Sequence, residues 1–376
     1  MDFQLCSYCL ERHNTNPYAK PAPSPTACFI CQGSLSILPQ LAQMAAEASA
    51  KLEWETFGVQ ANLPRDILLR EEKLFDFENI ENSMAIKNQS NRLAIDCLQK
   101  ITGKMFSQNA ELQFVLDFSN QIGRAVPANI YIFGHYNKKT RDFCQHDWAC
   151  SACRGKGCKK CNFHAQNYPS IESAIREVFA PAFGASDSNL HASGREDVDV
   201  MCLGNGRPFV LELIHPAKRK ADLDALAQKL ASKFPLEVQG LQYCSRLWIE
   251  SVCNSHFEKH YRAWVGGEKE FSEEDAKKLE SAAPLGLLQN TPTRVLGRRS
   301  DLLRPRKIYE IKEVSFSPKE IVLDIWAEAG TYIKEFVHSD SGRTKPSISS
   351  ILGVQCSCRQ LDVMGIDDIF TKTLRA

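Results

Sequence analysis

The sequence lacks any long hydrophobic run. No apolar stretch approaches the roughly 18 residues that a membrane-spanning helix needs. The segment Met1–Cys6 also lacks the basic start and apolar stretch of a secretory signal. We therefore expect a cytoplasmic protein that does not cross a membrane. We see no internal repeat and no low-complexity tail, and the 376 residues predict two or three domains of about 100 to 200 residues each.

The sequence also has almost no net charge, with 46 Lys and Arg against 45 Asp and Glu. This balance does not exclude a nucleic-acid partner, because phosphate contacts need only a local basic surface. Basic residues gather in three segments, Arg154–Lys160, Lys218–Lys220 and Arg294–Lys307. We interpret the third as a candidate phosphate-binding loop. For each segment taken alone, a solvated charged face is the alternative.

Cysteine, in contrast, is plentiful, with 15 residues. In a chain without a secretion signal, a reducing compartment favours metal sites over disulfides. Two Cys-x-x-Cys pairs joined by a loop suit a closed tetrahedral zinc site of four thiolates. We expect such a site to be formed by Cys6, Cys9, Cys28 and Cys31.

A second pair of Cys-x-x-Cys motifs flanks the turn Arg154–Gly157, whose glycines allow the backbone to bend sharply. We expect a second structural zinc here. The expectation that this segment binds a metal is better supported than the choice of the exact ligands. Cys144, His146 and His164 are alternative ligands, and a thioredoxin-like redox role is the alternative function. The favoured ligands are Cys150, Cys153, Cys158 and Cys161.

Hydrophobic periodicity predicts both helices and strands. Helices are expected over residues 38–52, 86–105, 170–183 and 223–234. Strands are expected over residues 112–118, 128–134, 207–214, 241–249, 307–314 and 320–327. The predicted fold class is α+β, with an antiparallel or mixed sheet and helices packed on it.

The motif with the clearest chemical content is Gly-Arg-Glu-Asp-Val-Asp-Val at residues 194–200, followed by Leu203–Phe209. It resembles the catalytic motif of the stand-alone archaeal and eukaryotic tRNA pseudouridine synthase family that acts on the T-arm. The resemblance implies that Asp197 is the catalytic carboxylate, with Asp199 and Glu196 as rivals. It also implies that the N-glycosidic bond of a uridine breaks and the uracil rejoins the ribose through carbon, without a redox cofactor or a catalytic metal.

Two further segments are similar to motifs of that family. Ala329–His338 places Lys334 as the cation beside the aspartate, and such a cation keeps a buried carboxylate ionised. A surface strand lysine is the alternative. Lys259–Val265 places Tyr261 as the residue that stacks on the extruded base, with Tyr309 as its rival. Whether the aspartate attacks the anomeric carbon or removes a sugar proton stays open.

The same resemblance implies substrate contacts. Pro346–Gly353 corresponds to the segment that forms the aliphatic wall of the base pocket. The loop after Asn290 corresponds to a segment that contacts the RNA backbone. Two positions depart from the family pattern, because Met201 stands where an arginine is expected and Gly297 where a histidine is expected. The expected substrate-binding residues are Tyr332, Ile351, Leu352, Arg294, Arg298, Arg299, Arg195 and Tyr309.

These motifs suggest four parts along the chain. We expect a zinc knuckle at 1–35, a small α+β domain at 36–145, a second cysteine knuckle that forms a hinge at 146–166, and the catalytic domain at 167–376. The second part resembles a THUMP domain, an RNA-binding module, and the segment Tyr136–Lys139 would give it a basic tip. The expected partner is the T-arm of tRNA, and the expected state is a monomer.

Other functions compete with this expectation. A zinc-containing tRNA-binding protein without catalysis is the main alternative. A THUMP-type methyltransferase or thiolase would need a glycine-rich loop that opens a helix, and Leu203–Gly206 is shorter and precedes a strand. A zinc deaminase would need His-x-Glu paired with a downstream Pro-Cys-x-x-Cys, which the sequence lacks. Whether tRNA position 54, position 55 or both are modified stays open.

Overall fold

The computed structural model describes residues 2–13, 16–76, 84–162, 164, 166–297 and 299–370. The chain forms two compact units. The first contains Met1–Ile130 with the short segments Ala182–Ser186 and Ile214–Ala221, and the second contains the rest. In the described part of the chain, no helix has both the length and the apolar character needed to cross a membrane.

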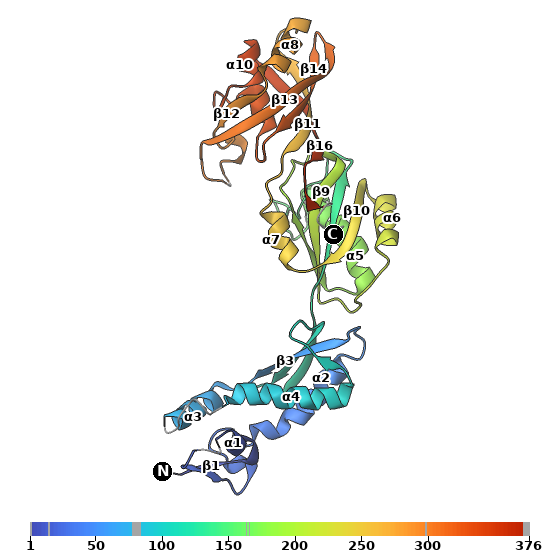
Figure 1. The fold of residues 1–376 in the computed structure, drawn as a ribbon. Helices are drawn as coiled ribbons and strands as arrows, with labels where there is room; N and C mark the ends of the chain where they lie inside the picture. The colour runs from blue at the N-terminus through green and yellow to red at the C-terminus, as the bar shows by residue number, and fades with distance from the viewer. Residues whose placement is uncertain are drawn as a thin grey trace. The chain divides into compact units, whose positions relative to one another are not determined.

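The first unit begins with a small parallel pair of strands and continues into a four-stranded sheet with the order β4-β3-β5-β6. Its helices α2 and α4 pack against the sheet and against each other (Figure 1). The elements are β1 (Phe3–Leu5), α1 (Ser7–Arg12), β2 (Ala19–Pro21), η1 (Pro25–Ala27), η2 (Ser34–Ile37), α2 (Leu38–Ala48), β3 (Thr56–Asn62), α3 (Arg65–Phe75), α4 (Ile86–Thr102), β4 (Met105–Phe106), β5 (Leu112–Asp117) and β6 (Ile122–Pro127).

One hydrophobic core joins the N-terminal cysteines to this sheet. Cys6 and Cys31 belong to the same buried cluster as Leu41 of α2 and Phe57 and Phe114 of the sheet. The knuckle at 1–35 and the sheet that follows therefore pack as one body, because their apolar side chains share one interior.

The second unit is built on a ten-stranded sheet with the order β10-β7-β9-β16-β11-β14-β13-β12-β15, to which β8 is added beside β9. The sheet is mixed, since β16 runs parallel to β9 and antiparallel to β11. Its elements up to β11 are β7 (Ile130–Lys138), η4 (Lys159–Cys161), α5 (Ile171–Phe183), β8 (Asp187–Ala192), β9 (Met201–Ile214), α6 (Leu223–Lys233), β10 (Leu236–Cys244), α7 (Leu247–Cys253) and β11 (Lys259–Gly267).

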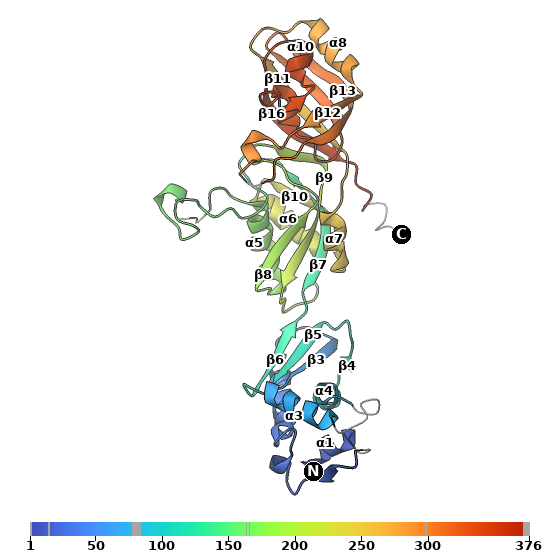
Figure 2. The ribbon, with the colours of Figure 1, turned by 90° about the vertical axis from the view of Figure 1, so that its left-hand side faces the viewer.

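The later elements complete the same sheet and its helices (Figures 1 and 2). They are α8 (Glu273–Ala282), β12 (Leu285–Gln289), η5 (Thr293–Val295), β13 (Arg304–Ser317), β14 (Glu320–Ala327), α9 (Ile333–His338), β15 (Thr344–Lys345), α10 (Ile348–Leu352) and β16 (Cys356–Ile366). The predicted α+β class and the mixed sheet with flanking helices are confirmed.

Two sequence predictions need correction. The strand expected at 241–249 ends at Cys244, and helix α7 begins at Leu247. The strand expected at 128–134 was assigned to the N-terminal domain, but β7 pairs with β10 in the ten-stranded sheet. Lys138 therefore does not form a basic tip, because its side chain is fully buried. The second error arises because β7 pairs with a distant segment, which local periodicity does not report.

Gly204 and Gly206, considered above as a cofactor loop, have a packing role instead. Gly204 lies in β9 with φ +63°, and a Cβ atom there would lie 2.0 Å from the carbonyl oxygen of Met364 on β16. Gly206 has φ +78°, and its Cβ would lie 2.9 Å from the carbonyl oxygen of Tyr136 on β7. Only glycine allows both this backbone conformation and this close approach of neighbouring strands.

We predict that Gly204→Ala lowers the melting temperature. A left-handed alanine costs roughly 1–2 kcal/mol before the clash is counted, which corresponds to a drop of roughly 2 to 8 °C for a unit of this size. Differential scanning calorimetry measures the shift. The control is Gly286→Ala in β12, where an added Cβ meets nothing within 4 Å. Equal melting temperatures for the two variants would contradict this account.

Candidate active site

Asp197 lies in the loop between β8 and β9, and its carboxylate faces two cations. Arg294 Nη1 lies 3.0 Å from Oδ1 and 3.0 Å from Oδ2. Lys334 Nζ lies 3.2 Å from Oδ2. The Asp197 side chain remains 39% exposed. The carboxylate is thus paired with positive charge and still open to a ligand.

Lys334 occupies the first turn of α9 and contacts two carboxylates. Its shortest contacts are to Asp199, at 2.8 Å from each carboxylate oxygen. Burial alone would lower the pKa of Lys334, but the hydrogen bond to Asp199 and the charges of Asp197 and Asp199 raise it. Burial would likewise raise the pKa of Asp199, but the hydrogen bond and charge of Lys334 lower it. Both groups are therefore held in their charged forms.

Arg294 lies in η5 and is oriented by Glu335, a residue that sequence reasoning did not select. Arg294 Nε donates to Glu335 Oε1 at 2.7 Å, and the Glu335 side chain is only 2% exposed. Burial would lower the pKa of Arg294, but Glu335 and Asp197 raise it. The sequence assigned Arg294 to RNA contact, whereas the structure places its guanidinium on Asp197.

A buried network lies behind the loop. Arg207 Nε donates to Glu196 Oε2 at 2.7 Å, and Nη1 donates to the Ser193 carbonyl at 2.7 Å. Tyr136 donates its hydroxyl to Glu196 at 3.0 Å. Gln145 donates to the Tyr136 hydroxyl and to the Gly194 carbonyl, at 2.8 and 2.9 Å. Glu196, a rival for the catalytic role, is thus a buried structural partner of Arg207.

Lys138 supports the same loop from β7. Its ammonium donates to the carbonyls of Phe143, Asp197 and Val198 at 2.9, 3.0 and 2.9 Å. Burial lowers the pKa of Lys138, and the charge of Glu196 opposes this effect. The sequence did not predict this role, because Lys138 and Lys139 at the end of an apolar strand look like ordinary surface lysines.

Tyr261 lies on β11, two strands from the strand that follows the Asp197 loop. It pairs with Val363 of β16, and Val363 pairs with Cys202 of β9. Tyr261 is therefore separated from Cys202 by two strand spacings, roughly 10 Å. Burial raises its pKa to about 12. Among the described residues, the contacts of Asp197 do not include Tyr261.

The rival Tyr309 is engaged elsewhere. It lies on β13 with its ring centroid 4.9 Å from that of Trp326. A hydrogen bond to Glu258 is the main cause that raises its pKa. Tyr309 therefore contacts neighbouring strands.

The remaining expected substrate residues lie on several segments. Arg299 Nη1 donates to the Tyr332 hydroxyl at 3.1 Å, next to the turn that carries Lys334. Arg195 is exposed in the Asp197 loop. On α10, Leu352 is 9% exposed and Ile351 is half-buried. Arg298 lies outside the described residues.

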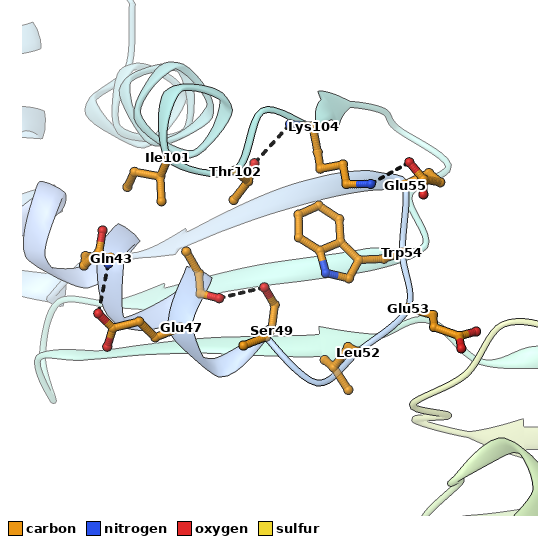
Figure 3. Close-up of a pocket in the computed structure, with 12 residues that line it drawn as sticks. Gln43, Glu47, Ser49, Leu52, Glu53, Trp54, Glu55, Ile101, Thr102 and Lys104 are labelled. Atoms are coloured by element: carbon orange, nitrogen blue, oxygen red, sulfur yellow. Dashed lines mark hydrogen bonds and ion pairs between the residues drawn. The ribbon is translucent and has the colours of Figure 1, made fainter.

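A separate open pocket lies on the first unit (Figure 3). It is lined by Trp54 and Lys104 together with the carboxylates Glu47, Glu53 and Glu55. Lys104 Nζ lies 2.6 Å from Glu55 and 5.9 Å from the centre of the Trp54 ring. Because carboxylates outnumber cations here and Lys104 is already paired, the pocket does not suit a phosphate.

Comparison with known proteins places these residues in a family. Residues 131–367 match the family model described as Pus10, C-terminal. The chain is also similar to the tRNA pseudouridine synthase Pus10 of Methanopyrus kandleri, with 32% identity over 353 residues that cover 91% of this chain and 81% of the relative. The chain belongs to the Pus10 family. The resemblance found in the sequence is confirmed.

Other Pus10 relatives match over similar lengths. The tRNA pseudouridine synthase Pus10 of Archaeoglobus fulgidus is 32% identical, with 90% of this chain and 94% of the relative covered. Among solved structures, a Cbf5-Nop10-Gar1 complex matches 62% of this chain and 48% of that chain, at 14% identity and a TM-score of 0.35. That score is too low to support an argument about the site.

Both cysteine groups of this Pus10 chain are placed to bind a metal ion. In each group the four sulfur atoms lie within 4.8 Å of one another. The sulfur–sulfur distances are 3.5 Å for Cys6–Cys31, 3.9 Å for Cys153–Cys161 and 3.8 Å for Cys158–Cys161. Tetrahedral thiolates at about 2.3 Å from zinc are separated by roughly 3.8 Å, so both groups fit a closed site.

The alternative ligands near the second group lie apart from it. Cys144 Sγ lies 3.1 Å from the carbonyl oxygen of His146, and His146 Nδ1 lies 3.5 Å from Glu172. In the part of the chain that the structure describes, the group that converges contains Cys150, Cys153, Cys158 and Cys161 alone.

We predict two zinc ions per chain by plasma mass spectrometry of the purified protein. Cys28→Ser should lose one ion and lower the melting temperature, because the first group lies in the core of the first unit. Cys161→Ser should also lose one ion. Cys253→Ser, an exposed cysteine outside both groups, is the control and should retain two. An unchanged zinc content in Cys28→Ser would refute the assignment of the first site.

Proposed function

We propose that the chain is a tRNA pseudouridine synthase that converts a T-loop uridine to pseudouridine, at position 55 with position 54 as a second candidate target, and that Asp197 is the catalytic carboxylate. The observation that carries the proposal is a partly exposed aspartate between Arg294 and Lys334, in a chain of the Pus10 family. The curated relatives compared above bear the name tRNA pseudouridine synthase. The reaction moves a group within one molecule, so the enzyme is an isomerase.

The chemistry needs only groups that the chain supplies. The bond between ribose C1′ and uracil N1 breaks, the uracil turns, a bond forms between C1′ and C5, and the proton on C5 is transferred to solvent while N1 gains one. Atoms and electrons balance, so no redox cofactor takes part. Asp197 either attacks C1′ or removes a neighbouring sugar proton, and both routes require the ionised carboxylate.

Arg294 and Lys334 supply the electrostatic condition for this chemistry. A carboxylate enclosed by RNA loses water and would otherwise shift toward its neutral form. Two cations within 3.2 Å of the Asp197 carboxylate counter its negative charge. Their other partners, Glu335 and Asp199, orient them in advance, and such preorganisation is a main source of enzymatic rate enhancement.

The base would occupy a pocket formed by several strands and helices. In this proposal Tyr261 stacks on the extruded uracil, and Ile351 and Leu352 form its aliphatic wall. Of the two, Ile351 leaves more surface free for a base. Tyr309 is the weaker candidate for the stacking role, because it already packs on Trp326.

Binding energy for extrusion must come from contacts elsewhere on the tRNA. Extruding a stacked nucleotide costs a few kcal/mol. Arg195 and Arg299 are exposed near the site and suit phosphate contacts. Arg298 belongs to the same basic segment of the sequence. The first unit would act as the THUMP-like RNA-binding module, and zinc would stabilise both cysteine knuckles.

We predict that Asp197→Asn abolishes pseudouridine formation, with a loss of at least about 100-fold, while tRNA affinity changes little. The amide keeps the shape of the side chain but removes its charge. Unmodified tRNA transcript is incubated with the protein, and products are mapped by carbodiimide adducts and primer extension. Binding is measured by filter retention.

The control is Asp199→Asn, which removes the rival carboxylate in the same loop. It should keep measurable activity, because Lys334 still contacts Asp197. Full activity in Asp197→Asn would refute the site assignment. If the unaltered protein binds tRNA but yields no pseudouridine, the alternative function, a zinc-containing tRNA-binding protein without catalysis, replaces this proposal.

A further inference from the structure

The Asp197 loop is fixed through its backbone by two cations from one segment. Lys138 uses all three N–H donors of its ammonium, two of them on the carbonyls of Asp197 and Val198. Arg141 Nη1 donates to the carbonyl of Asp199 at 2.9 Å. Three successive carbonyls of the loop are therefore bound from residues 138–141.

The second cation is itself anchored. Arg141 Nη2 donates to Asp362 Oδ2 at 2.8 Å, and Asp362 is buried on β16. The same carboxylate accepts the backbone N–H of Met201 at 3.3 Å, where the loop enters β9. The middle of the loop is thus tied to β7 and its end to β16.

Lys138 is an unusual group for a purely structural role. Its side chain is fully buried, and within the described residues its ammonium forms no ion pair. Burying a charge is costly unless it is paired. Hydrogen bonds to the three carbonyls offset part of this desolvation cost. Two of these carbonyls belong to the segment that carries the proposed catalytic carboxylate.

We infer that Lys138 is a positioning residue. It fixes the backbone of Asp197, so that the carboxylate lies between Arg294 and Lys334 and is oriented towards the ribose of the bound uridine. The inference rests on the proposed function. A misplacement of about 1 Å in such a group can cost about 100-fold in rate. The role therefore predicts a loss of rate without a loss of tRNA binding.

The test is Lys138→Met, which keeps the length of the side chain and removes its donors. The single-turnover rate at saturating tRNA should fall about 100-fold, while the dissociation constant for tRNA stays within about twofold. Lys139→Met is the matched control, because this neighbouring lysine is half exposed and pairs with Glu237 at the surface. It should behave like the unaltered protein.

A second variant separates positioning from stability. Leu230→Ala removes a buried side chain in α6, which packs on β10, and should lower the melting temperature with little change in rate per folded molecule. If Lys138→Met does not fold, Lys138→Gln retains two N–H donors and should fold, with a reduced rate of pseudouridine formation.

A normal rate of pseudouridine formation in Lys138→Met or Lys138→Gln overturns the inference. Activity in Asp197→Asn would instead overturn the proposed function.

A separate observation concerns the second cysteine knuckle, residues 148–162. It carries four exposed cations, and the sequence has no Asp or Glu between Trp148 and Asn167. In the described residues these cations form no ion pair. Figure 2 shows the segment, in green, standing clear of the sheet. The cations are Arg154, Lys156, Lys159 and Lys160.

We propose that this knuckle is an RNA-contacting surface that binds tRNA phosphates, a role that also rests on the proposed function. Unpaired cations on a surface without carboxylates attract a polyanion and release its counterions on binding. A metal bound there would fix the backbone that carries these cations, since Lys159 and Lys160 lie between the candidate ligands Cys158 and Cys161. A protein partner would need an equally dense acidic surface to bind these cations. Folded tRNA carries such negative charge on phosphates over its whole surface.

The test compares two adjacent lysine pairs. Lys159→Ala with Lys160→Ala should weaken tRNA binding several-fold and reduce the slope of log K against log salt by about 1 to 2. Lys277→Ala with Lys278→Ala is the control, because these exposed lysines lie on α8 among Glu273, Glu274 and Glu280. Zinc content should stay at two in both variants.

Equal affinity and equal salt slope in the two double variants would overturn the knuckle proposal. A loss of zinc from the first variant would require Lys159→Gln with Lys160→Gln in its place, judged by the same two readouts. Absence of any tRNA binding by the unaltered protein would count against the proposed function itself.

Discussion

The contact between Asp197 and its two cations is the interaction that organises this structure. Arg294 follows β12, Lys334 begins α9, and Asp197 precedes β9, so three distant segments converge on one carboxylate. Each cation also has a second acidic partner, Glu335 for Arg294 and Asp199 for Lys334. The cations are therefore held in place even where Asp197 is engaged with substrate, which is the condition for electrostatic preorganisation.

A buried and fully hydrogen-bonded ion pair lies next to the partly exposed carboxylate of Asp197. Glu196 and Arg207 form a pair whose side chains are each 1% exposed, and Tyr136 completes its hydrogen bonding. Breaking one member of such a pair leaves a buried charge without a partner, which is strongly destabilising. The loop thus carries a partly exposed acid, the proposed catalytic carboxylate Asp197, next to the buried acid Glu196, which pairs with Arg207.

Local patterns in the sequence were sufficient for the parts of the site that are contiguous. The Cys-x-x-Cys pairs follow from their spacing, and helices α2, α4, α5 and α6 from periodicity, whereas Asp197 was selected through the resemblance of its motif to a family. The failures concern residues whose environment depends on distant strands. Lys138 was expected at a basic tip, but pairing of β7 with β10 places it in the interior. Arg294 lies 97 residues from Asp197, and no local signal reports their contact.

The two cysteine groups illustrate how burial distinguishes sites with the same ligands. All four sulfurs of the first group belong to buried residues inside the core of the first unit. Helix α1, which carries Cys9, is tied to α3 by the ion pair between Arg12 and Glu71, and Glu71 accepts the backbone N–H of Ile86 at 2.9 Å. A metal there stabilises the fold directly. In the second group three of the four cysteines are only partly buried, so a metal there orders a surface segment whose exposed cations remain free for a partner.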